Sequence, residues 1–249
     1  MSTLNFTLMA TSRLVEARII LRIAVTGIAC RGFIYCTQGN DSANRDATPP
    51  ACVGCGSKLS EISMQRIVVG ISGASGVIYG VRALEVLKEL GVETHLVMSK
   101  SAELTIHYEL DRSADDVKAL ATEVHAVRNV GASIASGSFK SLGMLIAPCS
   151  IRTLGEITSG VTSSLLTRAA DVVLKERRQL VLMVRETPFH LGHLKNMVSA
   201  TEMGAVIAPP LPAFYANPQT LDDIVNHSVG RALDLFDLDA PDTHRWTES

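Results

Sequence analysis

The stretch RIVVGISGASGVIYG, Arg66 to Gly80, decides the fold of this chain. Its apolar, β-branched start favours a strand, and the apolar spacing over 76–90 favours a helix. Between the two lie Gly73, Ala74, Ser75 and Gly76. Small residues let the backbone approach a ligand closely, and a helix N-terminus offers free N–H groups to an anion. We therefore expect a cradle for a phosphate or a flavin phosphate here, although a tight strand–helix turn also needs small residues.

This junction differs from the fingerprint of dinucleotide-binding proteins. Its glycines follow the spacing Gly70-x-x-Gly73-x-x-Gly76. The fingerprint also needs an acidic residue after the second strand to bind a ribose, and Ser99-Lys100 stands there instead. The sequence does not predict a dinucleotide site.

The rest of the body alternates strands and helices. The expected strands are Arg66–Ile71, Glu93–Ser99, Met144–Pro148, Gln179–Arg185 and Ala205–Ala208. The expected helices are 76–90, 165–178 and 220–235, and Ser113 to Asp116 resembles a further helix start. Apolar strands that alternate with helices predict an α/β sandwich, in which helices cover both faces of a mainly parallel sheet.

The functional residues are expected in the loops after the strands, because ligands of such sheets lie beyond the carboxyl ends. These loops are 72–76, 99–101, 149–153, 186–193 and 209–217. Ser150 and Thr153 repeat the small, hydroxyl-bearing design after the third expected strand. Arg185 and Glu186 end an apolar strand, where charge is costly unless it is solvated, paired or used. The loop up to Tyr215 is stiffened by proline, which also suits a rigid connector.

Composition limits the classes of partner. The net charge is −2, and the apolar runs are broken well before the roughly 20 residues that a spanning helix needs. We expect neither a nucleic acid nor a membrane as partner. Four of the five cysteines precede residue 56, so the body fits a reducing compartment. Cys52-x-x-Cys55 and His190-x-x-His193 have metal-ligand spacing without further ligands nearby, and no metal is predicted.

Residues 1–63 differ from the rest and are expected to lie outside the single domain, residues 64–249. The first forty residues contain several arginines and one acid, as mitochondrial presequences do, and a polar, small-residue stretch typical of disorder follows. Met64 stands just before the first strand, so an incorrectly assigned start is the alternative. The protein is expected in the cytoplasm if it is bacterial, and in mitochondria if the presequence is genuine.

Four segments of the body resemble the UbiX/Pad-type flavin prenyltransferases. They are GISGASGVIYG (70–80), SGSF with LIAPCSIRTLGEI (136–157), LTRAADVVLKERRQLVLMVRETPFHLGHLKNM (166–197) and GAVIAPPLPAFYANP (204–218). The resemblance covers 66 to about 237 and falls in the expected loops. It implies a Rossmann-like or flavodoxin-like three-layer sandwich that forms homo-oligomers, often dodecamers.

The resemblance also implies an activity. The family joins a dimethylallyl group from dimethylallyl phosphate to N5 and C6 of reduced FMN, without a metal ion. The product, prenylated FMN, serves UbiD-type decarboxylases.

Residue roles follow from the same motifs. The resemblance implies FMN contacts for Gly73, Ala74, Ser75, Ser99, Ser150, Ile151, Arg152, Thr153 and Arg185. It implies dimethylallyl phosphate contacts for Arg168, Lys175, Tyr215 and Arg231, with Arg168 reaching across a subunit interface. It implies catalytic roles for Ser75, Lys175 and Glu186, and Trp246 matches a variable aromatic residue of the tail.

The chain departs from the family at two places. Ile151-Arg152 replaces smaller residues of some members, and His190-Leu-Gly-His193 replaces a serine-rich stretch. These departures fit tuning of the site, or a branch that serves aromatic-acid decarboxylation instead of quinone synthesis. Two other functions stay open: a flavin-dependent cysteine decarboxylase on a similar fold, and a non-catalytic FMN carrier.

Overall fold

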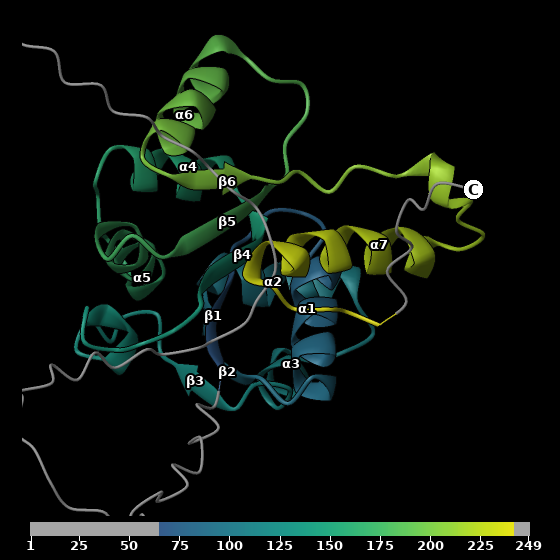
Figure 1. Cartoon of the computed structure of the whole chain (residues 1–249), viewed down its shortest axis with the longest axis horizontal. Helices are drawn as coiled ribbons and strands as arrows, with labels where there is room; N and C mark the ends of the chain where they lie inside the picture. Colours follow the sequence, from purple (N-terminus) through teal and green to yellow (C-terminus); the bar gives the residue numbers. More distant parts are fainter. Residues whose placement is uncertain (1–64, 242–249) are drawn as a thin grey trace, which may run out of the picture. The chain divides into compact units, whose positions relative to one another are not determined.

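A six-stranded, wholly parallel sheet forms the centre of the computed structural model, which describes residues 65–241 (Figure 1). The strands are β1 (Arg66–Ile71), β2 (Glu93–Met98), β3 (Glu123–His125), β4 (Gly143–Cys149), β5 (Gln179–Val184) and β6 (Ala205–Ile207). Their order is β3-β2-β1-β4-β5-β6, so the chain starts at the centre, runs to one edge, and returns to build the other half. The loops after β1 and β4 therefore diverge and open a crevice at the carboxyl ends of the strands.

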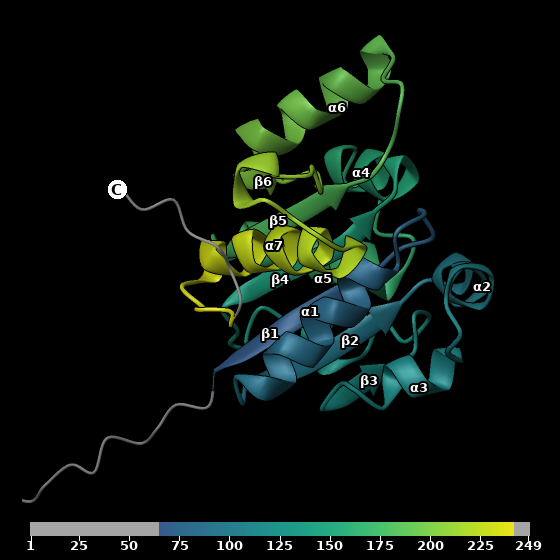
Figure 2. The ribbon, with the colours of Figure 1, turned by 90° about the vertical axis from the view of Figure 1, so that its right-hand side faces the viewer.

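Helices cover both faces of the sheet. They are α1 (Ile78–Glu89), α2 (Lys100–Glu109), α3 (Ala114–Lys118), α4 (Ile151–Thr158), α5 (Leu165–Lys175), α6 (Leu191–Glu202) and α7 (Leu221–Leu233). Figure 2 shows α1 beside α7, and these two pack together with parts of α2 and α3 on one face. Helices α4, α5 and α6 pack on the other face. The predicted three-layer α/β sandwich is confirmed.

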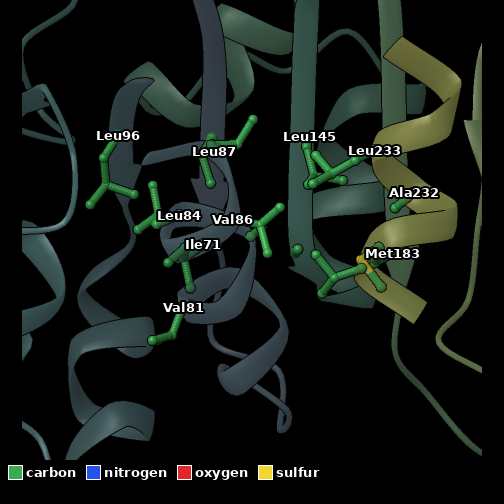
Figure 3. Close-up of a cluster of buried hydrophobic side chains, with 14 of the residues drawn as sticks. Ile71, Val81, Leu84, Val86, Leu87, Leu96, Leu145, Met183, Ala232 and Leu233 are labelled. Carbon is green, nitrogen blue, oxygen red and sulfur yellow. The ribbon is translucent and has the colours of Figure 1, made fainter. Parts of the chain in front are cut away.

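Two apolar cores lie on the two faces because successive strand side chains point to opposite sides. Ile67, Val69 and Ile71 of β1 enter one core, whereas Val68 enters the other. Figure 3 shows the first core, where side chains of α1 such as Leu84 lie against the strands and Leu233 of α7 lies close to Leu145 of β4.

The structure adds elements that the sequence pattern did not predict. Strand β3 has three residues, of which only His125 is buried, so it lacks the apolar run of an interior strand. Helix α2 starts in the expected loop 99–101 and buries only Ala102 and Ile106. Helix α6 begins within the expected loop 186–193 and buries only Ala200. Weak burial explains why these three elements were missed.

Among residues 65–241, no helix has the length and apolarity that crossing a bilayer requires. The predictions for the segment 1–63, for Cys52-x-x-Cys55 and for Trp246 lie outside the described residues.

Candidate active site

A polar cavity of about 330 Å³ lies at the crevice where β1, β2 and β4 end. It brings together loops that the sequence singled out separately: Gly73 after β1, Ser99 after β2, and Ser150, Arg152 and Thr153 after β4. The other lining residues are Ser72, Lys100, Ser101, Val127, Glu156, Ser163, Ser164, Leu166 and Thr167.

Three helix N-termini meet at this cavity. The hydroxyls of Ser99, Ser150 and Ser164 cap α2, α4 and α5, and accept hydrogen bonds from backbone N–H groups at 3.1, 3.2 and 3.4 Å. A helix N-terminus carries a partial positive charge and N–H groups without partners inside the helix. Together with the surrounding hydroxyls, the three ends suit a ligand that carries a phosphate and several polar edges.

Buried hydrogen bonds fix the loops after β1 and β4 against each other. Ser72 Oγ donates to the carbonyl of Pro148 at 2.8 Å and accepts from the N–H of Ser150 at 2.7 Å. Gly73 is required next to it, because a Cβ at this position would collide with the side chain of Ser101. The backbone at the mouth of the cavity is thus held in one conformation.

The start of α1 does not offer the free N–H groups that the sequence predicted. Glu109, the last residue of α2, places Oε2 at 2.8 Å from the N–H of Gly76 and 3.2 Å from that of Val77. Gly76 has a φ of +93°, which favours glycine. A carboxylate therefore takes the N–H groups of Gly76 and Val77, which are not free donors in this structure, and Glu109 is a supporting residue of this loop that sequence reasoning missed.

The remaining predicted residues of the first and third loops flank the cavity. Ala74 and Ser75 lie between Gly73 and the start of α1, with Ser75 exposed, and Ile151 is the first residue of α4. The exposed Arg152 is held by Glu156, whose Oε1 accepts from Nε at 2.9 Å, while its Oε2 accepts from Ser163 Oγ at 2.8 Å. A guanidinium is therefore anchored at the rim.

Arg185 and Glu186 follow β5 directly. Arg185 is exposed, and its backbone N–H donates to the carbonyl of Cys149 at 3.0 Å. Glu186 accepts from the backbone N–H of Thr187 at 3.0 Å. Within residues 65–241 no ion pair joins the two, so the structural ion pair considered above is not formed. Burial raises the pKa of Tyr79, and the charge of Arg185 opposes part of this rise.

Tyr215 and Arg231 both lie at α7. Tyr215 Oη lies 3.2 Å from Nε2 of His227, and the two rings make an edge-to-face contact. Arg231 donates to Asp234 at 2.7 Å and lines a cavity of about 230 Å³ beside Pro209 and Leu211. A single chain thus gathers these two residues next to the loop after β6 and outside the first cavity.

Lys175 lies near the amino ends of the strands, at the end of the sheet opposite the cavity. It ends α5, contacts Glu176 and lies beside Gly137. Strand β5, Gln179–Val184, lies between Lys175 and Glu186 and is about 17 Å long, so the two residues lie at opposite ends of this strand. Arg168, two turns earlier on α5, pairs with Asp171. One chain therefore does not bring Lys175 to Ser75 or Glu186.

Cys149 ends β4 beside the site and is fully buried. Burial raises the pKa of its thiol to about 12, so it remains protonated at neutral pH. Its role here is packing.

Comparison with known proteins identifies the family. The Flavoprotein family model matches residues 56–233. The flavin prenyltransferase UbiX of Thauera aromatica is 64% identical over 182 residues, which cover 73% of this chain and 94% of the relative. The crystal structure of AnUbiX (PadA1) in complex with FMN and dimethylallyl pyrophosphate is 51% identical, with a TM-score of 0.73, and the match covers 74% of this chain and 98% of that one. A dodecameric FMN-dependent UbiX-like decarboxylase from Escherichia coli O157:H7 is 49% identical, with a TM-score of 0.73 and coverage of 74% and 100%. The chain belongs to the UbiX family of flavin prenyltransferases.

Proposed function

We propose that this protein transfers the dimethylallyl group of dimethylallyl phosphate to reduced FMN and thereby makes prenylated FMN. The observation that carries the proposal is the meeting of three helix N-termini at a hydroxyl-lined cavity, in a chain 64% identical to a flavin prenyltransferase. The residues fit FMN, since N–H groups, hydroxyls and the rim arginine Arg152 match a phosphate and a polar ring edge. Both alternatives, the cysteine decarboxylase and the FMN carrier, are disfavoured by this identity.

The reaction balances without an oxidant. Reduced FMN supplies N5 and C6 as the atoms that become alkylated. The allylic carbon–oxygen bond breaks, and its electron pair leaves with the phosphate. Bonds from the five-carbon unit to N5 and C6 form, N5 releases its proton, and the alkene gains a proton as C6 loses one.

The FMN-binding set comprises Gly73, Ala74, Ser75, Ser99, Ser150, Ile151, Arg152, Thr153 and Arg185. The loops after β1 and β4 supply most of this set, and Ser72 holds these two loops together. Glu109 holds the start of α1, so it positions the loop that contains Ser75.

Charge builds on the departing phosphate, and fixed positive groups stabilise it. Lys175, Arg185 and Arg231 supply cations, Tyr215 supplies a phenol donor, and Arg168 adds a further contact. Each such donor contributes about 3 kcal/mol to transition-state stabilisation. Glu186 exchanges a proton with the phosphate or with the ring carbon. This cation set does the work that a metal ion does in other phosphate-releasing enzymes.

The active protein is a homo-oligomer in this proposal. Lys175 lies near the amino ends of the strands, far from the cavity of its own chain, so it serves the cavity of a neighbouring copy. A UbiD-type decarboxylase receives the product. The protein acts in the cytoplasm if it is bacterial, and in mitochondria if residues 1–63 are a genuine presequence.

The test incubates the full chain anaerobically with reduced FMN and either dimethylallyl phosphate or dimethylallyl pyrophosphate, and then weighs the flavin by mass spectrometry. We expect a gain of one five-carbon unit, C5H8, with the monophosphate, and the second arm determines whether the diphosphate also serves. An unchanged flavin with carbon dioxide released from a peptidyl cysteine would establish the decarboxylase instead. An unchanged flavin and no turnover with either donor would leave only the carrier.

A further inference from the structure

Two buried imidazoles and a carboxylate meet where β3 pairs with β2. In this parallel register, His95 lies opposite Glu123 and Val97 lies opposite His125. Because alternate residues share a face of the sheet, His95, Glu123 and His125 point to the same side. None of the three lines the catalytic cavity, so the cluster is independent of the proposed function.

The distances within the cluster equal those between neighbouring ligands around one ion, and the shortest of them is also a hydrogen bond between the two imidazoles. His95 Nδ1 lies 3.0 Å from His125 Nε2 and 3.4 Å from Glu123 Oε2. Metal–ligand bonds of 2.0–2.1 Å at angles of 90–110° place neighbouring ligand atoms about 2.9–3.4 Å apart. The ligand atoms of all three residues lie within 4.8 Å of one another.

A second carboxylate orients one imidazole. Glu93 Oε1 accepts from His95 Nε2 at 2.8 Å, and Arg66 holds Glu93 at 3.3 Å. His95 therefore carries its proton on Nε2 and offers the lone pair of Nδ1, which accepts a hydrogen bond from His125 Nε2 at 3.0 Å when no ion is bound. An ion would take the place of this shared proton. Imidazoles that bind metals donate their other N–H to a carboxylate in the same way. Phe139 makes an edge contact with the ring of His95 and shields it.

The cluster is buried except on the side of Glu123, which faces solvent. The side chains of His95 and His125 are 3% and 5% exposed, whereas Glu123 is 55% exposed. An ion would enter past Glu123 and keep a water molecule as its fourth ligand. His125 would then carry its proton on Nδ1, which lies 3.6 Å from Glu123 Oε1.

We propose that His95, His125 and Glu123 bind one divalent ion of the zinc class, with Glu93 as the positioning residue of His95. Two nitrogen ligands and one oxygen ligand suit zinc. Strand β3 has three residues and pairs only with β2, so the ion ties an edge strand to the sheet. The bound metal stabilises the folded protein, because the unfolded chain lacks the assembled site.

The test adds Co²⁺ to the full, chelator-treated chain and records the visible absorption of the ion, then repeats the titration with Zn²⁺ by calorimetry. We expect one equivalent bound through nitrogen and oxygen in the native protein. Glu123→Gln and His125→Asn abolish this equivalent, and Glu93→Gln weakens it by about 10- to 100-fold. Zn²⁺ raises the melting temperature of the native protein but not that of Glu123→Gln.

Matched controls separate this cluster from other ligands of the chain. His107→Asn, at an exposed helix position, and the double variant His190→Gln/His193→Gln keep the equivalent, and so does Cys52→Ser/Cys55→Ser. Glu123 is exposed, so its variant remains informative if His125→Asn does not fold. Absence of a bound equivalent in the native protein, or its survival in Glu123→Gln, overturns the proposal. The proposal is also overturned if the single bound equivalent gives a sulfur-to-cobalt charge-transfer band that Cys52→Ser/Cys55→Ser removes.

Discussion

At the residue scale, the site is built from small and hydroxyl-bearing side chains, and their order along the chain reveals only part of it. Ser99, Ser150 and Gly73 were predictable because each follows an apolar strand, where a parallel sheet places its ligands. Ser72 and Glu109 were not. Their contacts join residues 78 and 33 positions apart, and no local pattern marks such pairs.

Gly73 is the residue whose replacement most directly tests the cavity. A methyl group on Gly73 would collide with Ser101, so Gly73→Ala must displace one of two loops that line the site. We expect FMN affinity to fall at least tenfold, which corresponds to about 1.4 kcal/mol, as measured by fluorescence titration. Gly131→Ala is the matched control, because the nearest atom to its added methyl lies 3.5 Å away. Equal affinities of the two variants would show that the close approach of Gly73 to Ser101 does not matter for FMN binding.

At the element scale, strong helix signals were predicted correctly and weak elements were missed. The predicted starts at Ser113 and Thr220 are both capping boxes in the structure. In contrast, the pattern of β3 was invisible because a three-residue edge strand carries no period, and its place depends on pairing with β2. Sequence periodicity reports burial, so an element that buries little leaves little trace.

The cap of α7 gives a prediction of stability and of its pH dependence. Thr220 Oγ1 accepts from the N–H of Asp223 at 3.1 Å, so Thr220→Ala should lower the free energy of unfolding by about 1 kcal/mol in urea denaturation at pH 7. Hydrogen bonds from the backbone N–H groups of Gln219 and Thr220 lower the pKa of Asp223. Because the folded-state pKa is lowered, the contribution of Asp223 is complete above its ordinary pKa of 3.8 and is lost as the pH falls through the lower folded value.

A helical threonine without a capping role provides the control. Thr201 lies exposed on α6 and donates to the carbonyl of Met197, so Thr201→Ala should change the free energy of unfolding by less than about 0.5 kcal/mol. If both threonine variants lose the same stability, the cap of α7 contributes nothing of its own.

At the scale of the whole molecule, the parallel strands place the cavity beyond their carboxyl ends and Lys175 near their amino ends. The sequence analysis predicted a strand over Gln179–Arg185, between Lys175 and Glu186, and the structure confirms that β5 holds these two residues at opposite ends of the sheet. For Lys175 and Glu186, the motif resemblance identified the residues but not the subunit in which each one acts. Because β5 separates Lys175 from Glu186 within one chain, a shared site for the two residues requires two neighbouring copies of the chain.

Mixed oligomers test that statement. If Lys175 acts on the site of a neighbouring copy, co-expression of Lys175→Ala chains with Glu186→Gln chains restores about a quarter of the sites, because a random pair of neighbours combines both intact residues once in four. Co-expression of the Lys175→Ala/Glu186→Gln double variant with the native chain also yields about a quarter under this model. If both residues act within one chain, the first mixture stays inactive and the second retains about half of the sites. The rate of prenylated FMN formation per bound FMN, measured by mass spectrometry on differently tagged and purified mixtures, distinguishes the two cases, and an inactive first mixture would refute action across the interface.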